Sequence, residues 1–413
     1  MTPEPGRSRL SVVTLRAVGL AGAVALALGG CARIDDLADR LMDRRPPRER
    51  YLAGLAAAGL DRHALVRDWI AAGERALSDA PTVTSPHREE VVLPDDQPAA
   101  IGLRIELRRG QSVRFEVDLP GDTTSAIFVD ARPAGATGDS LGQPVAEADS
   151  GRRSVEFEPR RDGWYLFRAQ PELLRGGRFS VSLTVAPTLA FPVSGRGERE
   201  ILSRWGASRD GGRRRHHGID IFAPRGTPVL AASTGRVVEV GENELGGLVV
   251  WLRDERGNAQ YYAHLSAQLV AAGTTVAPGD TIGLVGNTGN ARTTPPHLHF
   301  GIYRRGEGPV DPFWFLHRPP GRIPALDVDT TLLGGFARPR LAGAVVRRGP
   351  RGDADTLRVI GPADSVRIVA AAGRWFRVQL ADGAQGFLAA RAAAPHPVAD
   401  PITVQGTGVV AAP

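Results

Sequence analysis

Three short patches of histidine and aspartate constrain the fold of this chain more than any other feature. They are His216-His217-Gly218-Ile219-Asp220, Tyr262-Ala263-His264-Leu265 and His297-Leu298-His299-Phe300. Most of the chain's nine histidines lie in them. A catalytic zinc ion typically takes three protein ligands of the histidine or carboxylate type and leaves a fourth position open. The patches offer more imidazole groups than one such ion needs, and the surplus is suited to proton transfer. The fold must therefore bring distant segments to one place.

The last patch is predicted to be a strand. His297 and His299 are separated by one residue, in a run where apolar residues alternate up to Tyr303. Residues two apart on a strand point to the same face of the sheet. Both rings would therefore enter one site, while Leu298 and Phe300 pack behind them.

The first patch is predicted to be a turn that leads into a strand. His216 and Asp220 are four residues apart, but Gly218 lies between them. Ile219 and Ile221 alternate with polar residues as in a strand, which argues against a helix. The aspartate would supply an anionic oxygen that partly neutralises the charge of a metal ion.

Each patch has a simpler interpretation when it is taken alone. Residues 213–217 are equally consistent with a solvated basic loop, and His264 with a histidine packed in the core. Taken together, the three patches favour a common site over these separate interpretations.

Further motifs accompany the patches in order along the chain. They are Gly226-Thr227-Pro228-Val229, Ala231 with Gly235 and Val237, the turn-rich segment 276–289, and Val310-Asp311-Pro312. With these motifs, the segment 190–318 resembles the lysostaphin-type zinc metallopeptidases, the murein endopeptidases that cut peptide cross-links in bacterial cell wall. The resemblance covers about a third of the chain.

The resemblance implies roles for individual residues. It implies three ligands of a single zinc ion, namely His216, Asp220 and His299. It also implies that His264 and His297 form the catalytic pair, which would orient a water molecule and stabilise the oxyanion. Which of the two is the base stays open at this stage. His217 would be the neighbour of a ligand, although the residues alone do not choose between His216 and His217.

The expected activity is hydrolysis of peptidoglycan cross-links by a metal-activated water. The family commonly has a Ser-Thr-Gly-Pro run before the final His-x-His, whereas this chain has a longer and more basic segment, 290–296. This difference concerns substrate preference. Many relatives lose ligands and regulate other wall hydrolases, but this chain keeps every functional position, which favours an enzyme. The alternatives are a non-catalytic envelope regulator or activator of such hydrolases, and a module that binds wall peptide without cleaving it.

Composition limits the classes of fold and partner. A chain of 413 residues has room for two to four domains, and its many glycines and prolines favour short strands and turns. The net charge is +6, and arginine supplies all the basic residues, since the sequence contains no lysine. This excess could help the protein approach an anionic wall or membrane surface. The arginines are spread through all segments without a recognised binding motif, so we expect no nucleic-acid partner.

The N-terminus resembles a bacterial lipoprotein signal. A basic start precedes the apolar run 17–28, which is too short to span a bilayer comfortably. Leu28-Gly29-Gly30-Cys31 then resembles the lipoprotein signal box. We expect residues 1–30 to be a signal peptide and Cys31 to be lipidated, which would anchor the protein to a membrane in the cell envelope. Ala32, in place of aspartate, favours the outer membrane facing the periplasm. The alternative is an ordinary secretory signal with an unrelated cysteine.

The remaining segments predict a mainly β protein. We expect a tether and a short helical pair over 31–80, with helices near 51–58 and 62–77 and with Asp61 capping the second. Residues 80–97 are polar and contain proline, which is typical of a linker, while alternating apolar residues predict a β-sandwich over 88–187. In that sandwich Trp164 and Tyr165 favour core positions over stacking on a sugar.

We expect a lysostaphin-type antiparallel β domain at 190–318. Three further segments are expected after it. We expect a linker at 319–340, an SH3-like barrel at 341–393 and a flexible tail at 394–413. Such barrels commonly bind wall peptides beside hydrolases, and the alternative is a structural cap. The expected partners are thus peptidoglycan peptide, a membrane through the N-terminal lipid, and other wall hydrolases or division proteins.

Overall fold

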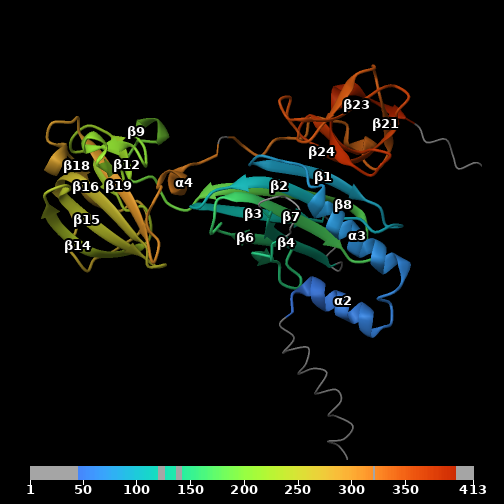
Figure 1. Cartoon of the computed structure of the whole chain (residues 1–413), viewed down its shortest axis with the longest axis horizontal. Helices are drawn as coiled ribbons and strands as arrows, with labels where there is room; N and C mark the ends of the chain where they lie inside the picture. The colour runs from blue at the N-terminus through green and yellow to red at the C-terminus, as the bar shows by residue number, and fades with distance from the viewer. Residues whose placement is uncertain (1–44, 120–125, 136–141, 320, 397–413) are drawn as a thin grey trace, which may run out of the picture. The chain divides into compact units, whose positions relative to one another are not determined.

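The computed structural model describes residues 45–119, 126–135, 142–319 and 321–396 (Figure 1). The predicted signal peptide, Cys31 and residues 397–413 of the predicted tail lie outside these residues. The chain divides into two compact units, 1–61 and 62–413, which are described separately. Among the described residues, no helix combines the length and apolar character needed to cross a bilayer.

The first unit contains helix α2 (Pro47–Ala57). It begins earlier than the expected 51–58, because a proline at the first position of a helix has no amide hydrogen to leave unsatisfied. Gly59 follows the helix with a φ of 72°, and its amide donates to Ala56 O. This left-handed glycine is the C-terminal cap expected from the sequence.

Helix α3 (Ala64–Ser78) opens the second unit and contacts strands β2 and β7. It buries a stripe that includes Trp69, whose indole nitrogen donates to Pro171 O at 2.8 Å. The cap expected at Asp61 is wrong. His63 caps the helix, because its Nδ1 accepts a hydrogen bond from the amide of Leu65 at 3.3 Å.

A two-layered antiparallel β-sandwich follows. One sheet has the order β2 (Ile101–Leu107), β7 (Gly163–Pro171), β4 (Ile127–Pro133) and β5 (Ala146–Glu147). The other contains β1 (His87–Leu93), β8 (Gly177–Pro187), β3 (Gln111–Asp118) and β6 (Ser154–Phe157). The two sheets share one apolar core, in which Phe115 and Phe167 have ring centroids 5.2 Å apart. Tyr165 is buried, while Trp164 is 36% exposed. The Arg104 guanidinium lies over the Trp164 ring, with Cζ 4.5 Å from the ring centroid.

Strand β1 lies in the segment 80–97, so the interpretation of that segment as a linker is wrong. The strand buries every second residue, namely His87, Glu89, Val91 and Leu93. Two of these inward positions hold ionisable residues, which is why the alternating pattern was not recognised. Arg377 balances the buried charge of Glu89, because its Nη1 lies 3.1 Å from Glu89 Oε2 and both side chains are buried.

The C-terminal strands extend the sheet that contains β1. They are β21 (Phe336–Pro339), β22 (Ala344–Arg347), β23 (Thr356–Ile360), β24 (Val366–Ala372), β25 (Trp375–Gln379), β26 (Gln385–Ala389) and β27 (Ala393–His396). Strand β24 pairs with β1 in antiparallel register, with Val91 opposite Ala370 (Figure 1). Strand β21 lies inside the segment 319–340, so its interpretation as a linker is wrong at the C-terminal end. These strands enclose their own apolar core, and an SH3-like barrel stays a prediction.

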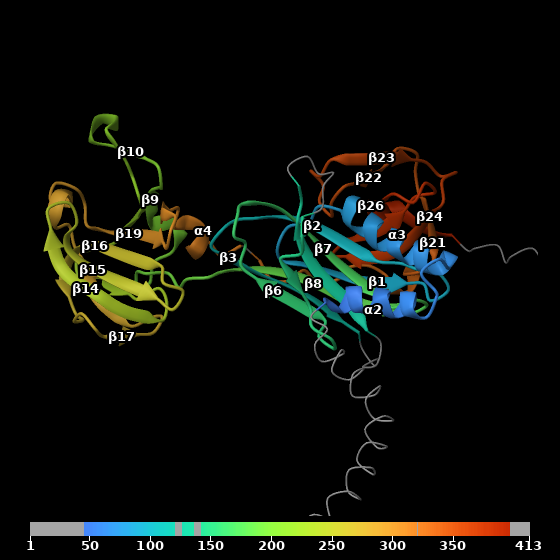
Figure 2. The same cartoon turned by 60° about the horizontal axis from the view of Figure 1, so that its bottom comes forward.

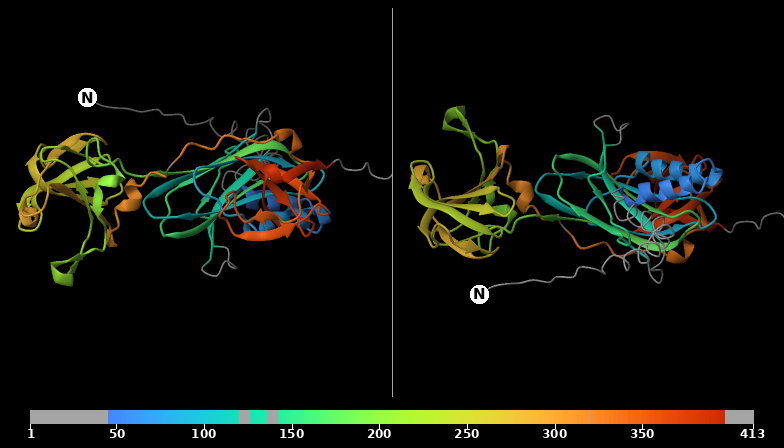
Figure 3. Two further views of the ribbon diagram at one scale, coloured as in Figure 1. Left: turned by 90° about the horizontal axis from the view of Figure 1, so that it is seen from above. Right: turned by 90° about the horizontal axis from the view of Figure 1, so that it is seen from below.

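The segment 190–318 forms a second antiparallel sheet. Its main path is β17 (Thr275–Val276), β14 (Gly235–Asn243), β15 (Gly247–Asp254), β16 (Ala259–Gln268), β19 (His297–Arg304), β12 (Ile219–Phe222) and β9 (Ile201–Ser203). Strands β13 (Pro228–Leu230), β18 (Thr281–Val285) and β20 (Gly308–Val310) pair at its sides, and helix α4 (Phe313–Leu316) follows. A separate hairpin of β10 (Ser208–Arg209) and β11 (Arg214–Arg215) projects from this sheet (Figure 2 and Figure 3). The expected mainly β fold with antiparallel sheets is confirmed.

Candidate metal centre

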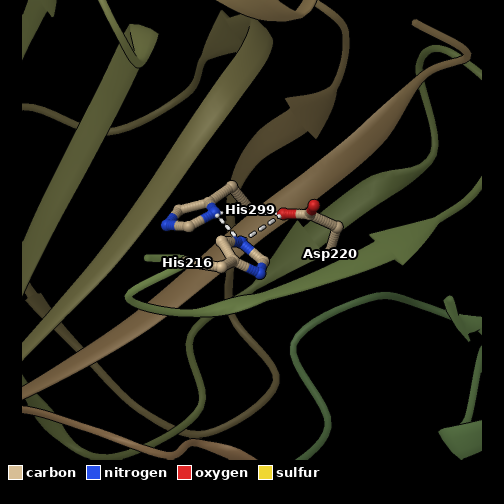
Figure 4. Close-up of side chains that lie close together, drawn as sticks. All are labelled: His216, Asp220 and His299. Atoms are coloured by element: carbon tan, nitrogen blue, oxygen red, sulfur yellow. Dashed lines mark hydrogen bonds and ion pairs between the residues drawn. The ribbon is translucent and has the colours of Figure 1, made fainter. Parts of the chain in front are cut away.

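The three side chains proposed as ligands meet at one point of the second sheet (Figure 4). His216 Nε2 lies 2.9 Å from His299 Nδ1 and 3.0 Å from Asp220 Oδ1. His299 Nδ1 is also 3.0 Å from Asp220 Oδ1. The three donor atoms therefore form a nearly equilateral triangle.

Strand register produces this meeting. Strands β12 and β19 pair so that Asp220 lies directly opposite His299. The chain turns just before β12, as expected, and this turn carries His216 to the same face. A Cβ atom at Gly218 would lie 2.6 Å from His299 Cε1, so only glycine leaves room for the ring. Behind the strand, Leu298 and Phe300 are fully buried, as predicted from the alternation.

The donor set fits a tetrahedral metal ion. Ligand bonds of about 2.0–2.1 Å to zinc imply ligand atoms about 3.3 Å apart, which is close to the edges of this triangle. His216 Nδ1 lies 3.0 Å from Arg204 O. A carbonyl only accepts, so Nδ1 carries the hydrogen and Nε2 keeps its lone pair for the metal. Two imidazoles and a carboxylate are ligands that suit zinc.

The local electrostatics set the charge of two of these groups. Burial raises the pKa of Asp220, but hydrogen bonds to His216 and His299 outweigh it and hold this pKa well below its usual range. Burial lowers the pKa of His299, although Asp220 opposes the change. At neutral pH the carboxylate is therefore anionic and the His299 ring is neutral, which is the state that binds a cation.

His264 and His297 lie beside this group, with ring centroids 5.0 Å apart. His264 Nδ1 donates to Thr288 O at 3.0 Å, and His297 Nδ1 donates to Pro295 O at 2.9 Å. Both rings are therefore fixed with Nε2 as the acceptor. Burial and the neighbouring His297 and His299 lower the pKa of His264 to about 4, so it is neutral at pH 7.

The backbone of His264 is strained. Its φ is 63°, in the left-handed region that residues other than glycine rarely adopt. The amide of His264 donates to Gly246 O at 2.7 Å. Close to this position, the pairing of β16 shifts register with β15 and also with β18. Such strain persists only where surrounding contacts enforce it, and it concentrates at functional sites.

A cleft of about 640 Å³ surrounds these residues. One part of it is an aromatic wall that the sequence analysis did not identify, made of Trp251, Tyr261 and Tyr303. Trp251 packs on both tyrosines, with ring centroids 4.3 and 5.2 Å away, and the Tyr261 ring centroid lies 5.8 Å from that of His299. Strand pairing places Trp251 opposite Tyr261, and this register is not visible in the sequence.

Other residues from the sequence analysis lie at the edge of the cleft. His217 is exposed and stacks on Trp205 with ring centroids 5.5 Å apart, outside the three-residue group. The segment that differs from the family pattern also lines the cleft through Asn290, Ala291 and Thr294. Its sequence can therefore affect substrate preference.

Comparison with known proteins identifies the domain that contains this site. Residues 214–312 match the model of Peptidase family M23. The chain is 41% identical over 135 residues to the L-Ala--D-Glu endopeptidase of Bacillus subtilis (strain 168). This match covers 30% of this chain and 41% of that protein. It is 38% identical over 136 residues to the DD-carboxypeptidase/endopeptidase Mpg of Neisseria meningitidis serogroup B, covering 33% of this chain and 29% of that protein. The chain thus spans less than half of these curated relatives.

A solved structure gives a related match. The catalytic domain of the antimicrobial peptidase lysostaphin from Staphylococcus simulans is 32% identical, and the match covers 32% of this chain and 92% of that domain, with a TM-score of 0.25. The match to the family model shows that residues 214–312 are a domain of Peptidase family M23, as the resemblance implied.

Proposed function

We propose that the M23 domain of this chain is a zinc-dependent endopeptidase that hydrolyses peptide cross-links of bacterial peptidoglycan. The observation that carries the proposal is the triangle of His216 Nε2, Asp220 Oδ1 and His299 Nδ1, with two further histidines in the same cleft. The names of the relatives support the reaction, because they describe endopeptidases.

The ligand residues would hold one zinc ion, with Asp220 as the anionic member. A zinc ion bound there supplies a water of near-neutral pKa and polarises the scissile carbonyl. His297 is the better candidate to take and return the proton, because its Nε2 lies 4.0 Å from Asp220 Oδ1, whereas burial lowers the pKa of His264 to about 4. His264, neutral at pH 7, would orient the reacting groups beside His297, whose ring centroid lies 5.0 Å away.

The test uses the mature protein and purified peptidoglycan, with and without zinc and a chelator. Mass spectrometry of the released muropeptides identifies new peptide ends. We expect new ends that disappear with the chelator and return when zinc is restored. Binding to the wall without cleavage would instead support the regulator or activator of other hydrolases.

The place of action is part of the same proposal. We infer attachment to the cell envelope through a lipid on Cys31, with the catalytic domain facing the wall. The substrate is a peptide of the wall, and the signal-like N-terminal sequence supports export. The C-terminal strands, if they form a wall-binding module, would keep the enzyme on its substrate.

A further inference from the structure

The two oxygens of Asp220 have different partners. Oδ1 faces His216 Nε2 and His299 Nδ1 at 3.0 Å each. Oδ2 accepts a hydrogen bond of 2.6 Å from Arg209 Nη2. The carboxylate therefore presents one oxygen to the metal position and commits the other to a guanidinium.

Arg209 is itself held in place. The same Nη2 donates to Ser203 Oγ at 2.6 Å, and Ser203 pairs with Asp220 across strands β9 and β12. The hairpin that carries Arg209 is tied to a ligand residue, because Gly206 N donates to His216 O and His216 N donates to Ala207 O, both at 2.9 Å. The arginine thus belongs to the framework of the site.

We propose that Arg209 is a positioning residue that restricts Asp220 to one coordinating oxygen. This inference rests on the proposed zinc site. A free carboxylate binds a cation through one oxygen or both. An oxygen that accepts a charge-assisted hydrogen bond does not coordinate the cation, so the other oxygen binds alone. Coordination through a single oxygen keeps a position open for water and substrate, which a catalytic site requires.

The positive charge of Arg209 does not rule out this role. A guanidinium near a cation repels it, but the Arg209 side chain is 30% exposed, so water screens the repulsion. The Asp220 carboxylate also lies between the two charges. The role of Arg209 is therefore to select a geometry, and the experiment must report geometry as well as rate.

The test replaces zinc with Co²⁺, whose visible absorption is strong in four-coordinate sites and weak at higher coordination numbers. The full-length protein is compared with Arg209→Ala, Arg209→Met and Arg209→Lys. The methionine keeps the side-chain stem, and the lysine keeps a charged donor. Arg215→Ala is the matched control, because Arg215 lies on the same hairpin, is exposed and donates a hydrogen bond of 3.3 Å to Gly206 O.

We expect strong absorption for the wild type, Arg209→Lys and Arg215→Ala. We expect absorption at least several-fold weaker for Arg209→Ala and Arg209→Met, with Co²⁺ still bound, and muropeptide release slowed about 10- to 100-fold. Unchanged spectra in both variants would overturn the role of Arg209 and leave the zinc site intact. A wild type that binds neither Co²⁺ nor Zn²⁺ would overturn the proposed function as well.

Discussion

At the scale of single residues, the candidate site contains proposed metal ligands and two further histidines beside them. His216 and His299 place donor atoms 3.0 Å from Asp220 Oδ1, whereas His297 Nε2 lies 4.0 Å from it and His264 lies outside the three-residue group. This division makes substitutions of the two classes differ in their effect on zinc content.

Replacement of His216 or His299 by alanine should abolish both zinc binding and activity. His264→Ala should retain about one zinc per chain while activity falls about a hundredfold or more, because the group that orients the reacting atoms is lost. Zinc content is measured by elemental mass spectrometry beside muropeptide release. His217→Ala serves as a control that keeps both. Loss of zinc from His264→Ala would show that a ligand has been misassigned.

Gly218 is required for space and not for chemistry. A Cβ atom there would lie 2.6 Å from both His299 Cε1 and Phe300 O. Gly218→Ala should lower stability by about 1–3 kcal/mol, the usual cost of overpacking, and weaken zinc binding because the His299 ring must move. Denaturant unfolding and zinc titration measure the two effects. Gly352→Ala is the control, since a Cβ at Gly352 meets nothing within 4 Å; equal effects in both variants would contradict the argument.

At the scale of elements, strand β1 depends on a partner far away in the sequence. Glu89 on β1 and Arg377 on β25 are both buried, and Arg377 Nη2 also donates to Gly102 O. The strand therefore joins the sandwich and the C-terminal strands through an ion pair as well as through its ladder with β24.

Removal of one member of this ion pair should cost more than removal of both. Glu89→Met leaves the buried Arg377 guanidinium without its carboxylate, and Arg377→Met leaves Glu89 with the hydrogen bond to His87, so each change should cost about 3–5 kcal/mol. The double variant should be much less destabilised than the sum of the two. Denaturant unfolding of all four proteins measures the coupling. Strictly additive single effects would mean that the ion pair contributes nothing as a pair.

The same ion pair should make stability depend on pH. Burial raises the pKa of Glu89, but the charge of Arg377 and the hydrogen bond with His87 outweigh it and leave this pKa below the unfolded value of 4.5. A lowered folded pKa stabilises the protein above pH 4.5, and this contribution disappears as the pH falls through the folded value. Unfolding free energies measured on acidification should thus decline more steeply for the wild type than for the Glu89→Met/Arg377→Met variant. Parallel curves would contradict this assignment.

At the scale of the whole molecule, the M23 domain is one part of the chain. The M23 match covers 214–312, while the sandwich and the C-terminal strands have their own apolar cores. The proposed attachment at Cys31 would hold all of these parts at a membrane surface. Attachment and catalysis should therefore be separable by mutation.

The Cys31→Ala variant should lose lipid without loss of catalysis. In cells fed a palmitate analogue, the wild type should take the label and sediment with membranes, while Cys31→Ala should take none. Purified Cys31→Ala protein should still release muropeptides. The His264→Ala variant provides the opposite control, labelled but inactive. A Cys31→Ala protein that still takes the label would exclude the lipoprotein interpretation.

Regular alternation made most of the sandwich predictable. The runs that begin at Leu103 and Val113 have apolar residues on one face and became β2 and β3. Strand β1 was missed because His87 and Glu89 occupy inward positions, where a sequence pattern expects apolar residues. Glu89 pairs with His87 and with Arg377, which is 288 residues away, and such a distant pairing leaves no local signal.

The sequence by itself indicated the three patches from which the site would be built, because histidine and aspartate are concentrated in them, while the choice of His216 over His217 came from the family resemblance. It also determined that His297 and His299 share a face, since alternation on a strand is a local property. Only the tertiary structure decided that Arg209 contacts Asp220 and that Trp251 and Tyr261 form a wall beside His299. Those contacts depend on strand register and on a hairpin folding back, and register is set by packing among distant segments rather than by neighbours in the chain.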